Sequence, residues 1–150
     1  ALIEAAGFAV YGVAQLIRRK SLKKMDKDLF VLAATYLLLA IFYAAFEKIV
    51  INYRPVLVDG KLEASYPSST TMLALCILPT AMLQLRGRIR STAVRKTVLC
   101  LLAAVTAILV VGRLISGVHW LSDILGGVFL SAGLVLLYAF ICPEDSPSNA

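Results

Sequence analysis

The sequence predicts an all-α integral membrane protein, a bundle of about five transmembrane helices. The 150-residue chain is 60% hydrophobic and only 16% charged, which is more apolar and less charged than a typical soluble domain. Its mean hydropathy is +0.85. Its apolar residues are collected into long runs instead of alternating with polar residues at the period of a surface helix or strand. Water is therefore not the main solvent around this chain.

Three apolar runs contain no charged residue and are about long enough to cross a hydrocarbon core as a helix. They are Leu29 to Phe46, Ala64 to Leu85 and Ile124 to Pro143. A fourth run, Thr97 to Gly112, is shorter, but the basic side chains that flank it can reach the membrane interfaces. We expect all four runs to span the membrane.

The first apolar run, Ala5 to Ile17, is too short to span a membrane alone. No basic segment precedes it, so it is not typical of a signal peptide. We interpret it as the later part of a helix that begins before Ala1, with the N-terminal part of the bundle missing. The tail, 143–150, is rich in Pro, Ser and acidic residues and is predicted to be disordered, which leaves 1–142 as one transmembrane domain.

The net charge of +6 comes largely from two short basic clusters, Arg18 to Lys27 and Arg86 to Lys96, which lie between apolar runs. Such clusters mark the cytoplasmic loops of membrane proteins, and this explanation is favoured over nucleic-acid binding. The outer segments are then Glu47 to Thr71 and Arg113 to Asp123. The chain is therefore predicted to be a multi-pass cell-membrane protein whose remaining polar residues gather on the extracytoplasmic face.

The second outer segment contains the only histidine, His119, with Asp123 four positions later and Arg113 six positions earlier. On a helix that begins near the histidine, the carboxylate would share its face and hold the imidazole in one tautomer. A lone pair of this kind is more often an ordinary interfacial pair. The arginine favours a functional site, because it lies apart from the basic clusters and a guanidinium can bind two phosphate oxygens.

The first outer segment adds Lys48, Arg54 and the hydroxyl-rich stretch Tyr66 to Thr71. Small hydroxyl residues and free amides at a helix N-terminus form an anion site, so Ser68 and Ser69 are candidate phosphate ligands. Each feature alone has a simpler explanation. The basic residues, Lys48 in particular, can anchor lipid headgroups, and the serines can form an ordinary helix cap.

Together these segments resemble the type 2 phosphatidic acid phosphatase family. Its signature is Lys and Arg-Pro, then Pro-Ser-Gly-His, then Ser-Arg, five residues, His, three residues and Asp. The third motif matches in spacing through Arg113, His119 and Asp123, with Gly112 in place of the family's Ser. The resemblance extends from about Lys48 to Asp123.

Two of the motifs depart from the family pattern. Lys48 and Arg54 enclose five residues instead of six, and on a regular helix this shift would turn the lysine side chain by about 100°. Pro67-Ser68-Ser69-Thr70 stands where the family has Pro-Ser-Gly-His, so Thr70 occupies the place of a general-acid histidine. A hydroxyl of such high pKa cannot donate a proton at neutral pH.

The resemblance implies a lipid phosphate phosphatase in which His119 becomes phosphorylated, Asp123 orients it and Thr70 lies at the acid position. The residues that would bind phosphate are Lys48, Arg54, Ser68, Ser69 and Arg113. No cofactor and no metal are expected, because the arginines already supply a positive field. Since the acid is absent, a lipid diphosphate such as undecaprenyl pyrophosphate is the first candidate substrate, and a phosphatidate-type lipid is the second.

Two other classes of protein remain open from the sequence. The chain is either this phosphatase, or a weakened or inactive family member that binds lipid phosphate headgroups through the same arginines, or a transporter-like bundle with an incidental anion site. The sequence does not predict an oligomeric state, nor the chain or headgroup of the lipid.

Overall fold

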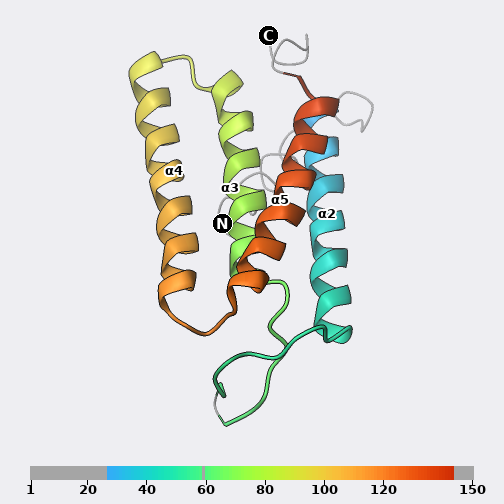
Figure 1. The fold of residues 1–150 in the computed structure, drawn as a ribbon. Helices are drawn as coiled ribbons and strands as arrows, with labels where there is room; N and C mark the ends of the chain where they lie inside the picture. Colours follow the sequence, from blue (N-terminus) through green and yellow to red (C-terminus); the bar gives the residue numbers. More distant parts are fainter. Residues whose placement is uncertain (1–26, 59, 144–150) are drawn as a thin grey trace.

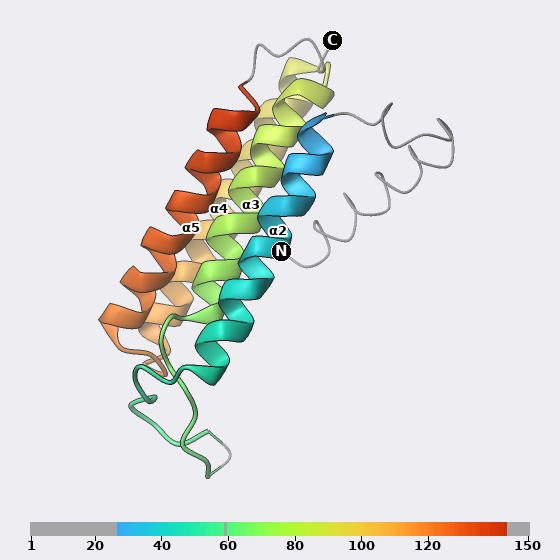
Figure 2. The same cartoon turned by 90° about the vertical axis from the view of Figure 1, so that its right-hand side faces the viewer.

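The structure is a computed structural model that describes residues 27–58 and 60–143. Four long helices run side by side as a bundle, each antiparallel to the next along the chain (Figures 1 and 2). They are α2 (Lys27–Lys48), α3 (Ser69–Arg88), α4 (Thr92–Ile115) and α5 (Leu121–Ile141). In these two ranges the only β pairing is two isolated bridges. The first apolar run, Ala5 to Ile17, and the end of the predicted tail, 144–150, lie outside the described residues.

Three of these four helices, α2, α4 and α5, are long and apolar enough to cross a membrane. The predicted all-α membrane fold is confirmed. The helix α3 is less apolar because it lies at the centre of the bundle, where it contacts the other three helices. One of its buried polar side chains, Thr80, is paired inside the protein: its hydroxyl donates to the carbonyl of Cys76 at 2.7 Å and lies 3.0 Å from the Tyr36 hydroxyl.

The core of the bundle lies where α2, α3 and α5 meet, around the buried side chains of Leu39, Met72, Cys76, Ile77 and Leu134. The helix α4 is different, because Thr106 is its only buried residue and the rest of its surface is half-buried or exposed. Apolar side chains such as Ile108 and Ile115 are largely exposed on it. This surface suits contact with lipid chains, whose polarity matches that of the side chains.

Two glycines let α5 approach the start of α3 closely. A Cβ atom on Gly127 would lie 3.2 Å from the carbonyl oxygen of Ser68 and from the amide nitrogen of Met72. A Cβ atom on Gly126 would lie 2.5 Å from the ring of Tyr66. This approach allows the amide of Ser68 to donate a hydrogen bond to the carbonyl of Asp123 at 2.9 Å.

The loop from α2 to α3 and the shorter connection from α4 to α5 lie at the same end of the bundle, at the bottom of Figure 1. The turn from α3 to α4 lies at the opposite end, together with the start of α2 and the end of α5. The two segments that the sequence assigned to one face therefore do meet at one end of the molecule.

Candidate active site

His119 lies in the connection between α4 and α5, two residues before α5 begins, and not on a helix as the sequence suggested. Gly117, with a φ of +67°, allows the chain to turn at this point. The imidazole is buried, with 6% of the residue exposed. Its Nδ1 lies 3.1 Å from the carbonyl oxygen of Ser65 and 3.2 Å from the Ser65 hydroxyl.

These contacts define the tautomer of His119. A carbonyl oxygen can only accept a hydrogen bond, so Nδ1 carries the proton and donates to Ser65. In the neutral ring, Nε2 is then unprotonated and has a free lone pair. The Nη2 atom of Arg113 lies 3.1 Å from Nε2 and donates to it.

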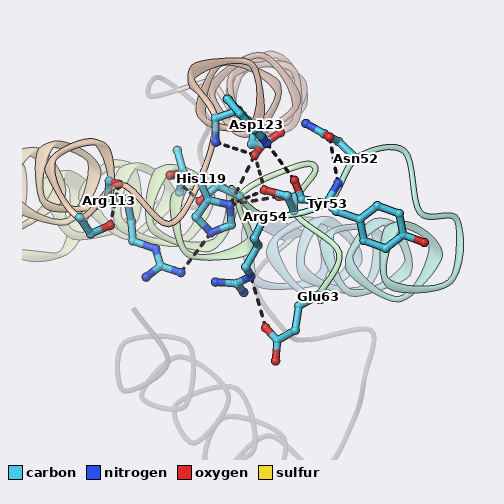
Figure 3. Close-up of polar contacts among 12 residues, drawn as sticks. Asn52, Tyr53, Arg54, Glu63, Arg113, His119 and Asp123 are labelled. Atoms are coloured by element: carbon cyan, nitrogen blue, oxygen red, sulfur yellow. Dashed lines mark hydrogen bonds and ion pairs between the residues drawn. The ribbon is translucent and has the colours of Figure 1, made fainter. Parts of the chain in front are cut away.

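Two guanidinium groups, those of Arg54 and Arg113, extend on one side of the imidazole (Figure 3). Burial lowers the pKa of His119 below its ordinary value of 6.5, and the positive charges of Arg54 and Arg113 lower it further. The charge of Asp123 and the hydrogen bond to the Ser65 carbonyl act in the opposite direction but are smaller. His119 is therefore neutral at physiological pH, as a nucleophile requires.

Asp123 is the third residue of α5 and is fully buried. Its Oδ2 accepts a hydrogen bond from the backbone amide of Trp120 at 2.8 Å, which caps the helix, and another from the hydroxyl of Ser65. The same oxygen lies 3.7 Å from Nδ1 of His119, beyond hydrogen-bond distance. The carboxylate is therefore connected to the imidazole mainly through Ser65.

Ser65 is a site residue that the sequence did not reveal. It is 2% exposed and contacts both His119 and Asp123, which lie more than fifty positions further along the chain. A serine near the start of an apolar run has no local feature that marks it as functional. Only the approach of α5 to the segment before α3 brings it into the site.

The three residues at the start of α3, Ser68, Ser69 and Thr70, lie in different positions relative to the pocket beside His119. The buried Ser68 precedes the helix, and its hydroxyl accepts a hydrogen bond from the Thr71 hydroxyl at 3.0 Å. Ser69 lines a small pocket beside His119. Thr70 lies in the first helical turn, partly buried, and is not among the residues that line this pocket.

The small pocket, about 20 Å³ in volume, lies beside the imidazole. Arg54 and Glu47 line it, and the Nε atom of Arg54 lies 3.3 Å from a carboxylate oxygen of Glu63. Lys48 is the last residue of α2, is exposed and does not line the pocket. The structure thus brings together Arg54, Ser69, Arg113, His119 and Asp123, and the amide of Ser68 bonds to the carbonyl of Asp123. Lys48 and Thr70 do not line the pocket.

No group of three or more His, Cys, Asp and Glu side chains that could hold a metal ion occurs within 27–58 and 60–143. The positive charge near His119 comes instead from the guanidinium groups of Arg54 and Arg113. That the reaction needs no metal stays a prediction, which a chelator can test.

The fold and the site define a membrane helical bundle with a buried histidine and two arginines at one end. Residues 48–145 match the model of the PAP2 superfamily, and the chain belongs to this superfamily. The family resemblance seen in the motifs is thereby confirmed.

The structure is similar to the crystal structure of a transmembrane PAP2-type phosphatidylglycerolphosphate phosphatase from Bacillus subtilis, with a TM-score of 0.71 and 19% sequence identity. The match covers 98% of this chain and 72% of the other. At this identity the similarity shows a shared fold. A search of curated proteins found no match.

Proposed function

We propose that this protein is a membrane-embedded phosphatase that hydrolyses lipid phosphates or diphosphates through a phosphohistidine. One observation carries the proposal most directly: the unprotonated Nε2 of His119 faces the guanidinium of Arg113, with the charge of Arg54 close by. A nucleophile and two cations around one small volume suit phosphoryl transfer, which depends mainly on positioning and charge stabilisation. Membership of the PAP2 superfamily supports the same class of reaction.

In the first step, Nε2 of His119 attacks the phosphorus, and the bond from phosphorus to the leaving oxygen breaks. The incoming phosphoryl group replaces the hydrogen bond between Arg113 and Nε2, so that the guanidinium contacts phosphoryl oxygens instead. The imidazole becomes positively charged, with Nδ1–H still bound to Ser65. The negative charge of Asp123 stabilises this cation.

In the second step, water attacks the phosphorus of the phosphohistidine, and the bond from phosphorus to nitrogen breaks. The electron pair returns to Nε2, and inorganic phosphate leaves. Arg54 and Arg113 neutralise the equatorial oxygens in both steps, and the residues expected to assist them are Ser68, Ser69 and Lys48. Of these three, Ser69 lines the pocket and Lys48 lies furthest toward solvent.

The threonine at position 70, where the family has a general-acid histidine, affects which substrate we favour. A threonine hydroxyl cannot protonate a leaving alkoxide at neutral pH. A lipid monophosphate that leaves from a diphosphate needs no such proton. We therefore favour a lipid diphosphate, such as undecaprenyl pyrophosphate, over phosphatidate or phosphatidylglycerol phosphate. In this proposal neither a metal nor another cofactor takes part.

The alternative is a weakened or inactive family member that binds lipid phosphate headgroups. Thr70 does not line the pocket beside His119, and a threonine hydroxyl could not act as a general acid at neutral pH, which supports this alternative. Binding would then use Arg54 and Arg113 alone, without phosphoryl transfer.

Phosphate release from purified protein distinguishes these two functions. We expect release from undecaprenyl pyrophosphate, with slower release from phosphatidate, in the presence of excess EDTA. His119→Ala should remove this activity, while Lys61→Gln, a charge change in an exposed loop, should retain it. Tight lipid binding without phosphate release from any of these lipids would favour the binding protein.

We further propose that the site faces the extracytoplasmic side. The end of the bundle opposite His119 carries the basic residues Arg86 to Lys96, and basic loops face the cytoplasm. A cysteine at Ser116, which is exposed in the connection from α4 to α5, should be labelled by an impermeant reagent in intact cells. A cysteine at Arg90 should be labelled only after permeabilisation, and the reverse pattern would overturn this orientation.

A further inference from the structure

Glu47, the second-last residue of α2, lines the small pocket beside His119. Among the described residues that line this pocket it is the one carboxylate. The helix α2 ends at the same end of the bundle as the connection from α4 to α5, so two segments far apart in the sequence bring Glu47 and the imidazole to one pocket (Figure 1). The steps of the proposed reaction give Glu47 no role.

The spacing between Glu47 and Arg54 also places this carboxylate at the site. In the family signature six residues separate the lysine from Arg-Pro, and the residue with this separation from Arg54 is Glu47, not Lys48. The structure agrees with this spacing, because Glu47 and Arg54 both line the pocket and Lys48 does not. In this chain a carboxylate therefore occupies the place of the family's lysine.

The carboxylate of Glu47 is available as a proton acceptor. Glu47 is exposed, and no other residue within 27–58 and 60–143 forms a hydrogen bond or ion pair with its side chain. Glu63 differs, because one of its oxygens lies 3.3 Å from Nε of Arg54 and it does not line the pocket. An ionised carboxylate accepts hydrogen bonds and cannot donate them, so Glu47 suits a step in which a proton is taken up.

Hydrolysis of a phosphohistidine needs a proton acceptor near the phosphorus. The attacking water must lose a proton, and Nε2 of His119 cannot accept it while it is bonded to phosphorus. Of the other groups in the pocket lining, Arg54 has no acceptor atom, and hydroxyl groups, which are protonated at neutral pH, are poor bases. The pocket volume of about 20 Å³ leaves room for a water molecule in the space that Glu47 and His119 both line.

We infer that Glu47 is the general base of the second step, an assignment that rests on the proposed function. The oxygen of water forms a bond to phosphorus while one of its protons passes to a carboxylate oxygen of Glu47. The bond from phosphorus to Nε2 breaks, its electron pair stays on the nitrogen, and hydrogen phosphate leaves. Because Glu47 is exposed, it then releases the proton to solvent and returns to the carboxylate.

Glu47→Gln tests this assignment, because it keeps the shape of the side chain and removes the basic carboxylate. Purified protein in detergent is mixed with a lipid diphosphate that carries ³²P in its terminal phosphate, chased with excess unlabelled lipid and quenched in base at intervals. We expect the phosphohistidine of Glu47→Gln to form but to decay roughly 10²-fold more slowly than that of the wild type, since general base catalysis contributes about 10² to 10⁴ in rate. The labelled fraction of the enzyme at steady state should rise, and phosphate release should fall.

Two further variants serve as controls. Lys61→Gln changes the charge of an exposed residue outside the pocket, and its intermediate should decay as in the wild type. Glu63→Gln makes the same replacement in a carboxylate outside the pocket, and any change in lipid affinity through Arg54 should leave the decay rate unaltered. Slow decay in Glu63→Gln with normal decay in Glu47→Gln would overturn the assignment.

The same experiment separates the general base from the proposed function. If the wild type releases phosphate without forming a phosphohistidine, the proposed mechanism fails and the base fails with it. If the wild type and Glu47→Gln form the intermediate and lose it at equal rates, the mechanism holds and Glu47 is not the base. A fall in phosphate release by Glu47→Gln without accumulation of the intermediate would place Glu47 in binding or in the first step, and would also overturn the assignment.

Discussion

The hydroxyl of Ser65 donates a hydrogen bond to the carboxylate of Asp123, across 58 positions of the sequence. The same serine accepts from the imidazole of His119 through its carbonyl oxygen, 3.1 Å from Nδ1. Ser65 therefore lies between the candidate nucleophile, His119, and the carboxylate of Asp123, whose negative charge stabilises a positively charged imidazole. This arrangement determines that Nδ1 of His119 carries the proton and that the unprotonated Nε2 faces Arg113.

Ser65→Ala should lower phosphatase activity on the order of tenfold to a hundredfold, the scale on which a misplaced reacting group affects rate. The substitution keeps the carbonyl that accepts from Nδ1 but removes the hydroxyl that connects Asp123 to the ring. We expect kcat to fall more than KM rises, because the hydroxyl does not contact the phosphate. Ser116→Ala, in an exposed loop, is the control, and equal activity of both variants would remove Ser65 from the site.

The protonation of His119 can be measured directly, because it is the only histidine in the chain. Its ¹⁵N resonances in labelled protein should titrate below 6.5, since burial and the two arginines lower its pKa. Phosphatase activity should fall as the pH drops through this value, because protonation removes the lone pair of Nε2. A titration above 6.5 in the wild type would contradict the proposed electrostatics.

Substitutions at Arg113 and Asp123 test whether each charge raises or lowers the pKa of His119. Arg113→Gln removes a positive charge that lowers the pKa of His119, so the titration should move to higher pH. Asp123→Asn removes a negative charge that raises the pKa, so the titration should move to lower pH. Shifts in the opposite directions would show that the charges do not act on the ring as described.

The close approach of α5 to α3 should be sensitive to a single methyl group. Gly127→Ala would place a Cβ atom 3.2 Å from two backbone atoms, the Ser68 oxygen and the Met72 nitrogen. Such overpacking typically costs about 1 to 3 kcal/mol, so thermal unfolding in detergent should occur at lower temperature. Gly133→Ala, on the same helix with open space around it, is the control. An unchanged unfolding temperature in Gly127→Ala would contradict the packing.

Thr70→His tests the missing acid. General acid catalysis contributes about 10² to 10⁴ in rate, and it matters most for the poorest leaving group. An imidazole at this position should therefore raise phosphate release from a lipid monophosphate more than from a lipid diphosphate. If neither rate changes while the protein stays folded and His119 remains essential, position 70 is not the acid position. Its location outside the small pocket beside His119 would then explain this result.

Much of the fold could be predicted from the sequence because lipid exposure imposes long apolar runs. The described helices α2, α4 and α5 coincide closely with such runs. The central helix was harder to delimit: its apolar run begins at Ala64, but α3 begins at Ser69 and continues to Arg88. Because α3 is enclosed by its neighbours, its residues need not be apolar, and composition marks its ends poorly.

Only the part of the candidate site whose residues lie close together in the sequence could be predicted. The spacing of Arg113, His119 and Asp123 identified one half of it, although His119 lies before a helix and not on one. The Ser65 contacts depend on how the loop after α2 lies against the start of α5, and the pairing of Arg54 with Glu63 depends on how that loop turns back on itself. No periodicity or spacing in the sequence carries that information.

The central claim is that His119 forms a covalent bond to phosphorus, and trapping that intermediate tests it most directly. Protein mixed briefly with a ³²P-labelled lipid diphosphate and quenched in base should retain label that is stable to alkali and lost in acid, as a phosphoramidate is. Because the chain contains a single histidine, the label must map to His119, and His119→Ala should retain none. Phosphate release by the wild type with no acid-labile label at any time, or continued turnover by His119→Ala, would contradict the account.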